Sequence, residues 1–234
     1  MKEINNIPEV QAQLMEAFTS RHACKVFDAD RKIDEAIFNT ILEAARMSPS
    51  SFGFEPWQIL VIQNDEKREL FRDFTWGANG AASGTAGQLG TASHFCIFLA
   101  HTDVNMKAGS DYLQNFMKEV KQLPDDVIEL FGQFYKKFQD HDFQIEGARQ
   151  ITDWSARQAY IALGNMMNTA ALLGVDSCPI EGFEIKRTQA TLEQHFDIDP
   201  TIYKPAVMAA FGYRAGDPMF PKSRRSMEQT VAWY

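Results

Sequence analysis

Two pairs of basic residues, one near each end of the chain, could bind an anion. Arg21 and Lys25 stand four positions apart where the first expected helix ends. Lys222 and Arg224 stand two apart, so their side chains point the same way from an extended chain. Guanidinium and ammonium groups hold phosphate through charge-assisted hydrogen bonds. Taken alone, each pair is more typical of a solvated helix end or basic tail.

Two short loops could present backbone groups to a flat ligand. Ser48-Pro49-Ser50-Ser51-Phe52-Gly53 is rich in small residues, which let backbone N–H and C=O groups approach a ligand closely. Pro179-Ile180-Glu181-Gly182 follows a short expected strand, and the Gly182 N–H could reach a ligand atom. Taken alone, each segment is more typical of an ordinary connection or turn.

Motifs for nucleophilic, metal or nucleotide-loop chemistry are missing from the sequence. The pattern HExxH is absent, as are GxSxG, a phosphate loop ending in GK[ST], and a GxGxxG that follows a strand. Histidines 94, 101, 141 and 195 have no metal-ligand spacing, so we expect no metal. Cys24 lies beside a lysine but has no His or Asp signature, which favours a buried small hydrophobe.

Composition predicts one globular domain over residues 1–234. The chain is 45% hydrophobic and 23% charged, which excludes extensive disorder. A net charge of −8 argues against nucleic-acid binding, which requires clustered cations. No apolar run reaches the ~20 residues of a membrane helix. The start of the chain has no apolar signal core, and its three cysteines form no disulfide framework, so we expect a cytoplasmic protein.

Hydrophobic spacing predicts a mixed α+β domain in which helices dominate. Expected helices span 8–19, 34–46, 65–74, 108–122, 125–139, 148–173 and 184–195, and expected strands span 57–62, 95–100, 175–178 and 205–212. Asp34 and Asp65 are expected N-caps, and Gly174 is expected to end the longest helix. That helix is apolar on most sides, which predicts a buried, central position. The glycine-rich stretch 76–92 is expected to be flexible or functional.

In this order, the motifs resemble those of the FMN-dependent nitroreductase family. The resemblance is to the branch of oxygen-insensitive NAD(P)H nitroreductases and dihydropteridine reductases, and it covers residues 12 to about 226. It is carried by Arg21-His22-x-x-Lys25, Ser48–Ser51, Pro56-Trp57, Ala92-Ser93-His94, Pro179–Phe183 and Pro221–Arg224. It implies a homodimer with FMN at the subunit interface. Each subunit would have a central mixed, mostly antiparallel sheet flanked by helices.

The resemblance also implies roles for individual residues. Arg21, Lys222 and Arg224 match residues that hold the FMN phosphate, and His22 matches one that acts mainly through its backbone. Lys25 matches a lysine beside flavin N1 and O2, where a cation stabilises reduced flavin. Ser48, Pro49, Ser50 and Ser51 match the loop that the partner subunit lays against the flavin ring. The segment under one face of the ring is matched by Pro179, Ile180, Glu181 and Gly182. There the Gly182 N–H would meet N5.

Five positions depart from the family pattern. Ala23 stands where a Ser or Thr commonly binds the phosphate. Gly53 and Glu55 stand where the loop commonly carries Asn and Gln. Thr85 and Gln88 align with an Asn and a Lys of close relatives. Without that lysine we expect weaker stabilisation of the anionic hydroquinone and a lower flavin potential.

The function that the resemblance implies is ping-pong hydride transfer. NADH or NADPH would reduce flavin N5, and a nitroaromatic, quinone or similar flat acceptor would then be reduced, without a catalytic side chain. One alternative is a flavin or pterin reductase with incidental nitro reduction, and another is a non-catalytic FMN-binding protein. Aromatic residues 131, 134, 135 and 138 are either a substrate lid or core. The tail, 213–234, cannot pack on itself, which favours a homodimer in which it wraps the partner.

Overall fold

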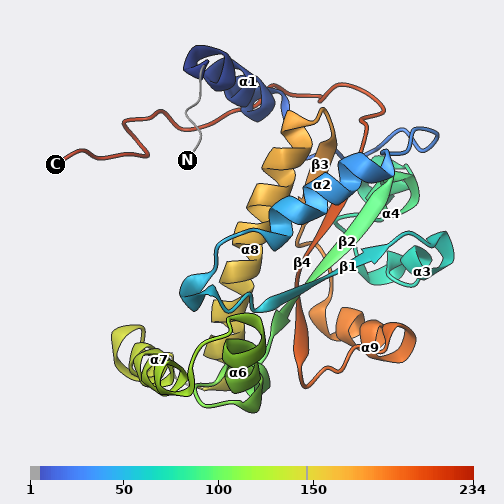
Figure 1. The fold of residues 1–234 in the computed structure, drawn as a ribbon. Helices are drawn as coiled ribbons and strands as arrows, with labels where there is room; N and C mark the ends of the chain where they lie inside the picture. The colour runs from blue at the N-terminus through green and yellow to red at the C-terminus, as the bar shows by residue number, and fades with distance from the viewer. Residues whose placement is uncertain (1–5, 146) are drawn as a thin grey trace.

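A computed structural model, which describes residues 6–145 and 147–234, has a four-stranded sheet at its centre (Figure 1). The strand order is β1 (Trp57–Ile62), β2 (His94–His101), β4 (Tyr203–Gly212), β3 (Asp176–Ile180), and every neighbouring pair is antiparallel. A parallel bridge between Ala23 and Ser177 adds a short parallel element at the edge. The expected α+β fold with a mostly antiparallel sheet is confirmed.

Helices cover both faces of the sheet because alternate strand residues point to opposite sides. Cys96 and Phe98 of β2 pack with α2 (Glu35–Arg46) and α8 (Ala148–Leu172). Phe95, Ile97 and Leu99 of the same strand pack on the other side. The helices on that side are α3 (Asp65–Glu69), α4 (Gly87–Thr91) and α9 (Ile185–Phe196). All eight residues of β2 are buried, which explains its continuous apolar run.

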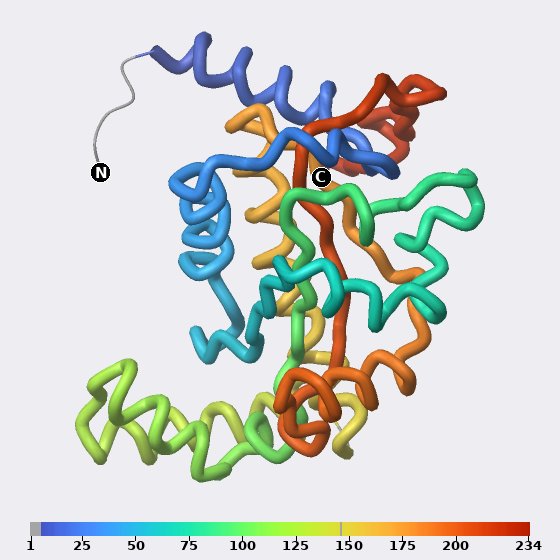
Figure 2. Tube along the Cα trace, turned by 90° about the vertical axis from the view of Figure 1, so that its right-hand side faces the viewer, coloured from blue at the N-terminus to red at the C-terminus, as the bar shows by residue number. Residues whose placement is uncertain are grey.

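A helical insertion between β2 and α8 forms a third hydrophobic cluster at one end of the molecule (Figures 1 and 2). It comprises α5 (Asp103–Met106), α6 (Asp111–Asn115) and α7 (Asp125–Lys137), and π-helical turns at Phe116–Val120 and Phe138–Asp142 extend the last two. The helical region expected over roughly 108–122 is present from 111 to 120, as the short helix α6 continued by a π turn. Ile151 and Trp154 of α8 close the cluster.

Capping confirms one helix start and corrects another. The Asp34 side chain accepts a hydrogen bond from the Ala36 N–H at 2.9 Å and caps α2, as expected. At α3 the cap is Asn64, whose side chain accepts from the Lys67 N–H at 2.8 Å, and not Asp65. The helix ends at Glu69, and a separate 3₁₀ turn covers Arg72–Phe74. Asp and Asn cap equally well, so adjacent candidates cannot be ranked by type.

The glycine-rich stretch is a set of tight turns. A Cβ on Gly80 would lie 2.1 Å from the Thr85 carbonyl oxygen, and one on Gly87 would lie 2.3 Å from that of Ala78. Both residues also have positive φ, which glycine adopts without strain. The 3₁₀ turn Ala81–Ser83 and helix α4 complete the segment, and Gln88 is buried. These glycines allow close backbone packing.

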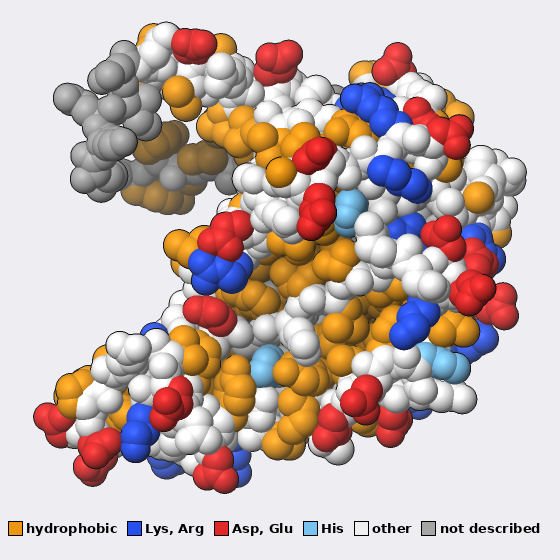
Figure 3. Space-filling view, turned by 45° about the vertical axis from the view of Figure 1, so that its right-hand side comes forward, with side chains coloured by type: hydrophobic (Ala, Val, Ile, Leu, Met, Phe, Trp, Pro, Cys, Tyr) orange, Lys and Arg blue, Asp and Glu red, His pale blue; other side chains and the backbone are white. Residues whose placement is uncertain are grey.

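Helix α8 is central, but it is not buried on all sides. Tyr160 and Ile161 are 39% and 42% exposed, so the expectation of an all-round buried helix is wrong for this stripe. Gly174, with φ +72°, follows the helix end as expected. Helix α1 (Ile7–Ser20) buries Ala17 alone, and the tail from 213 passes the end of α1 before its last residues extend away from the body (Figure 1). Hydrophobic side chains gather in the hollow between the two ends of the molecule (Figure 3).

Candidate functional site

The end of α1 and the C-terminal tail enclose a strongly cationic cavity. Its volume is about 350 Å³, and its lining includes Arg21, His22, Ala23, Pro179, Lys222 and Arg224. None of the described residues that line it is acidic. The Lys222 ammonium donates a hydrogen bond to the Phe18 carbonyl at the end of α1. Folding thus joins basic residues from opposite ends of the sequence, and the cavity suits an anion.

Two titratable groups at this cavity lie in surroundings that disfavour their positive charge. Burial, followed by repulsion from Arg21 and Arg224, lowers the pKa of Lys222. Burial also lowers the pKa of His22, with a smaller contribution from Arg214. Among the described residues, the buried Nδ1 of His22 has no hydrogen-bond partner. A bound anion would stabilise the ammonium group.

A second charged pair, Asp176 and Arg214, fixes the start of the tail. Arg214 Nη2 lies 2.6 Å from Asp176 Oδ1, and the Arg214 backbone N–H donates to Oδ2 at 3.0 Å. The same guanidinium donates to the Ser20 carbonyl at 3.1 Å, and its pKa is raised by the Asp176 hydrogen bond. The tail is therefore held against both β3 and α1. Sequence reasoning missed this pair because neither residue stands in a motif.

Gly182 lies directly against Gly77. The Gly77 N–H donates to the Gly182 carbonyl at 2.8 Å. A Cβ on Gly182 would lie 2.7 Å from the Gly77 Cα, so no side chain fits between them. Gly182 is buried, and within the described part of the chain its own N–H donates to no protein acceptor. The structure therefore leaves that N–H without a protein acceptor, and its role toward a ligand stays a prediction.

Lys25 and Gln88 meet at the Cys178 thiol behind this turn. Lys25 Nζ lies 3.6 Å and Gln88 Nε2 lies 3.4 Å from Cys178 Sγ. Cys24 is buried, as expected, and burial raises its pKa to about 12. Thr85 lies apart: it is exposed, and its hydroxyl oxygen accepts from the Gly87 N–H within the glycine-rich turn. The fold thus brings Lys25 and Gln88 together at Cys178, whereas Thr85 lies away from them in the glycine-rich turn.

The Ser48–Gly53 loop lies on another face of α8. Asn165 Nδ2 donates to Ser48 Oγ at 2.9 Å, and Gln158 Oε1 accepts from the Ser51 N–H at 2.9 Å. Gln158 and Asn165 are about two helical turns apart and share one face. Tyr160, which donates to Glu181, points about 200° away from Gln158. In one chain, therefore, this loop and the Pro179–Gly182 segment flank α8 without meeting.

The nitroreductase family model matches residues 18–213, which is most of the chain. This protein belongs to the nitroreductase family. A Bacillus subtilis relative with the provisional name NAD(P)H nitroreductase YfkO is 44% identical over 226 residues, covering 96% of this chain and 99% of that one. A Staphylococcus saprophyticus protein with the same kind of name is 43% identical, covering 96% and 98%.

Solved nitroreductase structures share the fold. A nitroreductase-like protein from Streptococcus mutans superposes with a TM-score of 0.75 at 18% identity, covering 98% of this chain and all of that one. A nitroreductase from Exiguobacterium sibiricum, solved in complex with FMN, gives a TM-score of 0.70 at 21% identity, with coverage of 94% and 97%. No helix of the described residues is long and apolar enough to span a membrane.

In this nitroreductase the insertion packs on the Ser48–Gly53 loop through Phe52. The Phe52 ring centroid lies 4.9 Å from that of Tyr135 and 5.0 Å from that of Phe138, and Phe131 also contacts it at 5.7 Å. Tyr135 is buried and donates to the Met106 carbonyl at 2.9 Å. Phe134 is 56% exposed. The core interpretation therefore holds for three of the four aromatic residues, and Phe134 is free to contact a ligand or partner.

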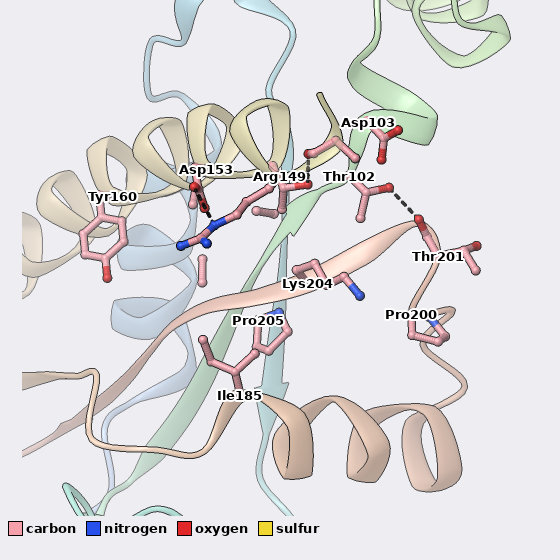
Figure 4. A pocket seen from close by; sticks show the side chains of 15 residues that line it. Thr102, Asp103, Arg149, Asp153, Tyr160, Ile185, Pro200, Thr201, Lys204 and Pro205 are labelled. Carbon is pink, nitrogen blue, oxygen red and sulfur yellow. Dashed lines mark hydrogen bonds and ion pairs between the residues drawn. The ribbon is translucent and has the colours of Figure 1, made fainter. Parts of the chain in front are cut away.

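Two further cavities follow the cationic one along the molecule. The nearer, about 340 Å³, is lined by Pro179 and Glu181 and by apolar residues of α8 and β4. The farther, about 660 Å³, lies between α8, β4 and the start of α9 (Figure 4). Pro179 lines the first two cavities, and Tyr160 lines the last two. Trp76, a residue that sequence reasoning passed over, is 70% exposed and flanks Gly182.

Proposed function

We propose that residues 1–234 form a single FMN-binding domain that works as an NAD(P)H-dependent nitroreductase. Its acceptors would be nitroaromatics, quinones or similar flat molecules. The names of relatives around 40% identical support this reaction class, and a neighbour solved with FMN supports the cofactor. The observation that carries the proposal is the cationic cavity joined, through Pro179, to the turn that offers the Gly182 N–H.

The residues present fit FMN. Arg21, Lys222 and Arg224 would hold the phosphate, since no described residue that lines their cavity is acidic. His22 supplies its backbone there, and Ala23 supplies no hydroxyl. The Gly182 N–H would face the ring edge, and Pro179, Ile180 and Glu181 would lie under one ring face. Lys25 and Gln88, which meet at Cys178, would bind the pyrimidine side.

When bound, FMN accepts a hydride from NADH or NADPH and passes it to the acceptor, so the protein needs no nucleophile or metal of its own. Gly182 orients the ring by its backbone donor, which the contact with Gly77 holds in place. Lys25 favours negative charge near the pyrimidine. Gln88 supplies a dipole where relatives have a cation, so we propose a lower flavin potential than in lysine-bearing relatives.

We further propose that the active unit is a homodimer. Ser48, Pro49, Ser50, Ser51 and Gly53 would lie against the flavin of the partner, because their own Pro179–Gly182 segment is on another face of α8. The exposed stripe at Tyr160 and Ile161, the outer face of α1 and the tail would be covered by the second subunit. Sedimentation should give a mass near twice the 26.5 kDa of the chain. A monomer at micromolar concentration would contradict the dimer.

An absorbance spectrum of the purified protein tests the function directly. We expect flavin bands that bleach on anaerobic addition of NADPH and return when a nitroaromatic or quinone is added. Bands that never bleach would support the alternative of a non-catalytic FMN-binding protein. No bound flavin after reconstitution with FMN would refute the proposal.

Two finer points complete the proposal. A flavin or pterin reductase would show the same bleaching, so kcat/KM must be compared across free flavin, pterin, quinone and nitroaromatic acceptors.

Cys24, Cys96 and Cys178 are all free and buried, which fits a reducing compartment, so we propose the cytoplasm. Fractionation of the source cells would test it.

A further inference from the structure

The side chain of Lys121, in the helical insertion, lies against the Ser48–Gly53 loop. A Cβ on Gly53 would lie 2.9 Å from Lys121 Nζ, so the ammonium group takes up the space that a side chain at position 53 would need. The family pattern commonly carries Asn at this position, where this chain has glycine. A positive charge from another segment therefore stands where the family pattern places a neutral amide.

Two aromatic rings hold this ammonium group in place. Lys121 Nζ lies 5.7 Å from the ring centroid of Phe54, beside the loop, and 5.6 Å from that of Phe131 in α7. Aromatic rings attract a cation that lies within about 6 Å of their centroid. Among the ion pairs of the described residues, none includes Lys121. Lys121 is half-buried, so its charge is only partly hydrated and can still attract an anion.

The backbone on both sides of this contact is in the left-handed region. Phe52 and Glu55 have φ of +59° and +47°, and Gln122 has φ of +53°. For a residue as bulky as phenylalanine this conformation is rare. Lys121 itself follows a π-helical turn, and its N–H donates to the Phe116 carbonyl at 3.1 Å. Strained residues and π turns occur often at functional sites, where the surrounding structure holds them in place.

We propose that Lys121 binds an anionic group of a substrate that lies on the flavin of the partner subunit. The inference rests on the proposed function, because it is there that the Ser48–Gly53 loop is placed against the second flavin. A lysine ammonium is a compact point charge that attracts a carboxylate, sulfonate or phosphate without a fixed geometry. The enzyme would then favour substrates with such a group over neutral molecules of the same shape.

Either substrate of the proposed reaction can bring the anionic group. The acceptor would carry it as a substituent of its ring, and NADPH would carry it as one of its phosphates. In ping-pong kinetics, kcat/KM for each substrate depends only on the half-reaction of that substrate. Separate measurements for the acceptor and for NADPH therefore distinguish the two sources.

The test compares 4-nitrobenzoate with 4-nitrobenzamide, which share a ring and a shape and differ by one charge. The first quantity measured is the ratio of kcat/KM for the benzoate to that for the benzamide, and the second is kcat/KM for NADPH. Lys121→Met keeps an apolar side chain over the two rings and removes the charge, and Lys121→Arg keeps the charge. Lys118→Met is the matched control, because Lys118 is an exposed lysine of the same π turn.

If the acceptor brings the anion, the benzoate-to-benzamide ratio should fall about three- to tenfold in Lys121→Met. If NADPH brings it, kcat/KM for NADPH should fall by a similar factor and the ratio should not change. Lys121→Arg should restore the affected quantity, and Lys118→Met should leave both as in the wild type. In the wild-type enzyme, 0.5 M salt should lower the same quantity, since screening weakens charge effects.

The inference and the proposed function fail differently. If Lys121→Met changes neither the ratio nor kcat/KM for NADPH, the lysine only joins the insertion to the loop, and the inference is overturned while the function stands. If Lys121→Met does not fold or loses its flavin, the wild-type salt series decides, and two quantities that do not respond to salt overturn the inference. A wild-type protein that binds no FMN, or does not oxidise NADPH, refutes the proposed function itself.

Discussion

Gly77 and Gly182 pack backbone to backbone, joined by the hydrogen bond from the Gly77 N–H to the Gly182 carbonyl at 2.8 Å. A Cβ on either residue would lie under 3.0 Å from the Cα of the other. This contact ties the glycine-rich segment to the turn after β3. It therefore fixes the direction of the Gly182 N–H, the donor on which the proposed flavin site depends.

Gly182→Ala should both destabilise the protein and weaken FMN binding. The new methyl group meets backbone, which cannot move aside cheaply, so we expect a loss of about 1–3 kcal/mol in the free energy of unfolding. Urea unfolding and FMN titration measure the two effects. Gly132→Ala in α7 is the control, because its Cβ meets nothing within 4 Å. Normal stability and FMN affinity in Gly182→Ala would contradict the tight contact.

Arg224→Gln should raise the Kd for FMN by about ten- to a hundredfold, the effect of losing a charge-assisted hydrogen bond of about 1.5–3 kcal/mol. The neighbouring Arg225 does not line the cationic cavity, so Arg225→Gln should bind FMN normally. Riboflavin, which has no phosphate, separates the two roles: its affinity should not change in Arg224→Gln. Equal losses for FMN and riboflavin would argue against a phosphate site.

Asp176→Asn should weaken FMN binding although Asp176 does not line the cationic cavity. The substitution removes the charge that holds Arg214, and with it the position of the tail that carries Lys222. We expect about a tenfold higher Kd for FMN, together with a lower Tm. Asp217→Asn, an exposed change in the same tail, is the control. A lower Tm with unchanged FMN affinity would limit the pair to a structural role.

The free energy of unfolding should fall as the pH drops from 6.5 toward 4. Burial lowers the pKa of His101 and of His94 to about 4, from an ordinary value of 6.5. In this window the unfolded chain takes up protons that the folded chain does not, so stability decreases with acid and levels off below pH 4. At about 1.4 kcal/mol per pKa unit, the shift from 6.5 to about 4 corresponds to roughly 3 kcal/mol for each histidine.

His101→Gln tests that pH dependence. It should reduce the slope of unfolding free energy against pH by about half, whatever its stability at pH 7, because His94 still titrates. Urea unfolding between pH 4 and 7 measures it. His195→Gln, at an exposed position in the last turn of α9, should leave the slope unaltered. An unchanged slope in His101→Gln would show that the side chain is accessible to protons when folded.

Local patterns in the sequence were sufficient for much of the fold and for the list of candidate residues. Strand alternation and the Asp34 cap depend on neighbours within a few positions, so β1, β2 and the start of α2 could be predicted. The order of six short motifs pointed to the family, which the family model and the relatives confirm. The binding roles of the individual residues stay predictions.

The tertiary structure alone decided which candidates meet. It brought Arg21 to Lys222, paired Asp176 with Arg214 and pressed Gly77 onto Gly182. The position of a charged residue or a glycine in the sequence does not show which distant residue it will contact, because such contacts depend on how whole helices and strands pack. The same reason explains why α8, apolar on most sides, keeps an exposed stripe at Tyr160. Hydrophobicity predicts that a face is buried, and only the packing of the whole chain shows that this face of α8 stays exposed in it.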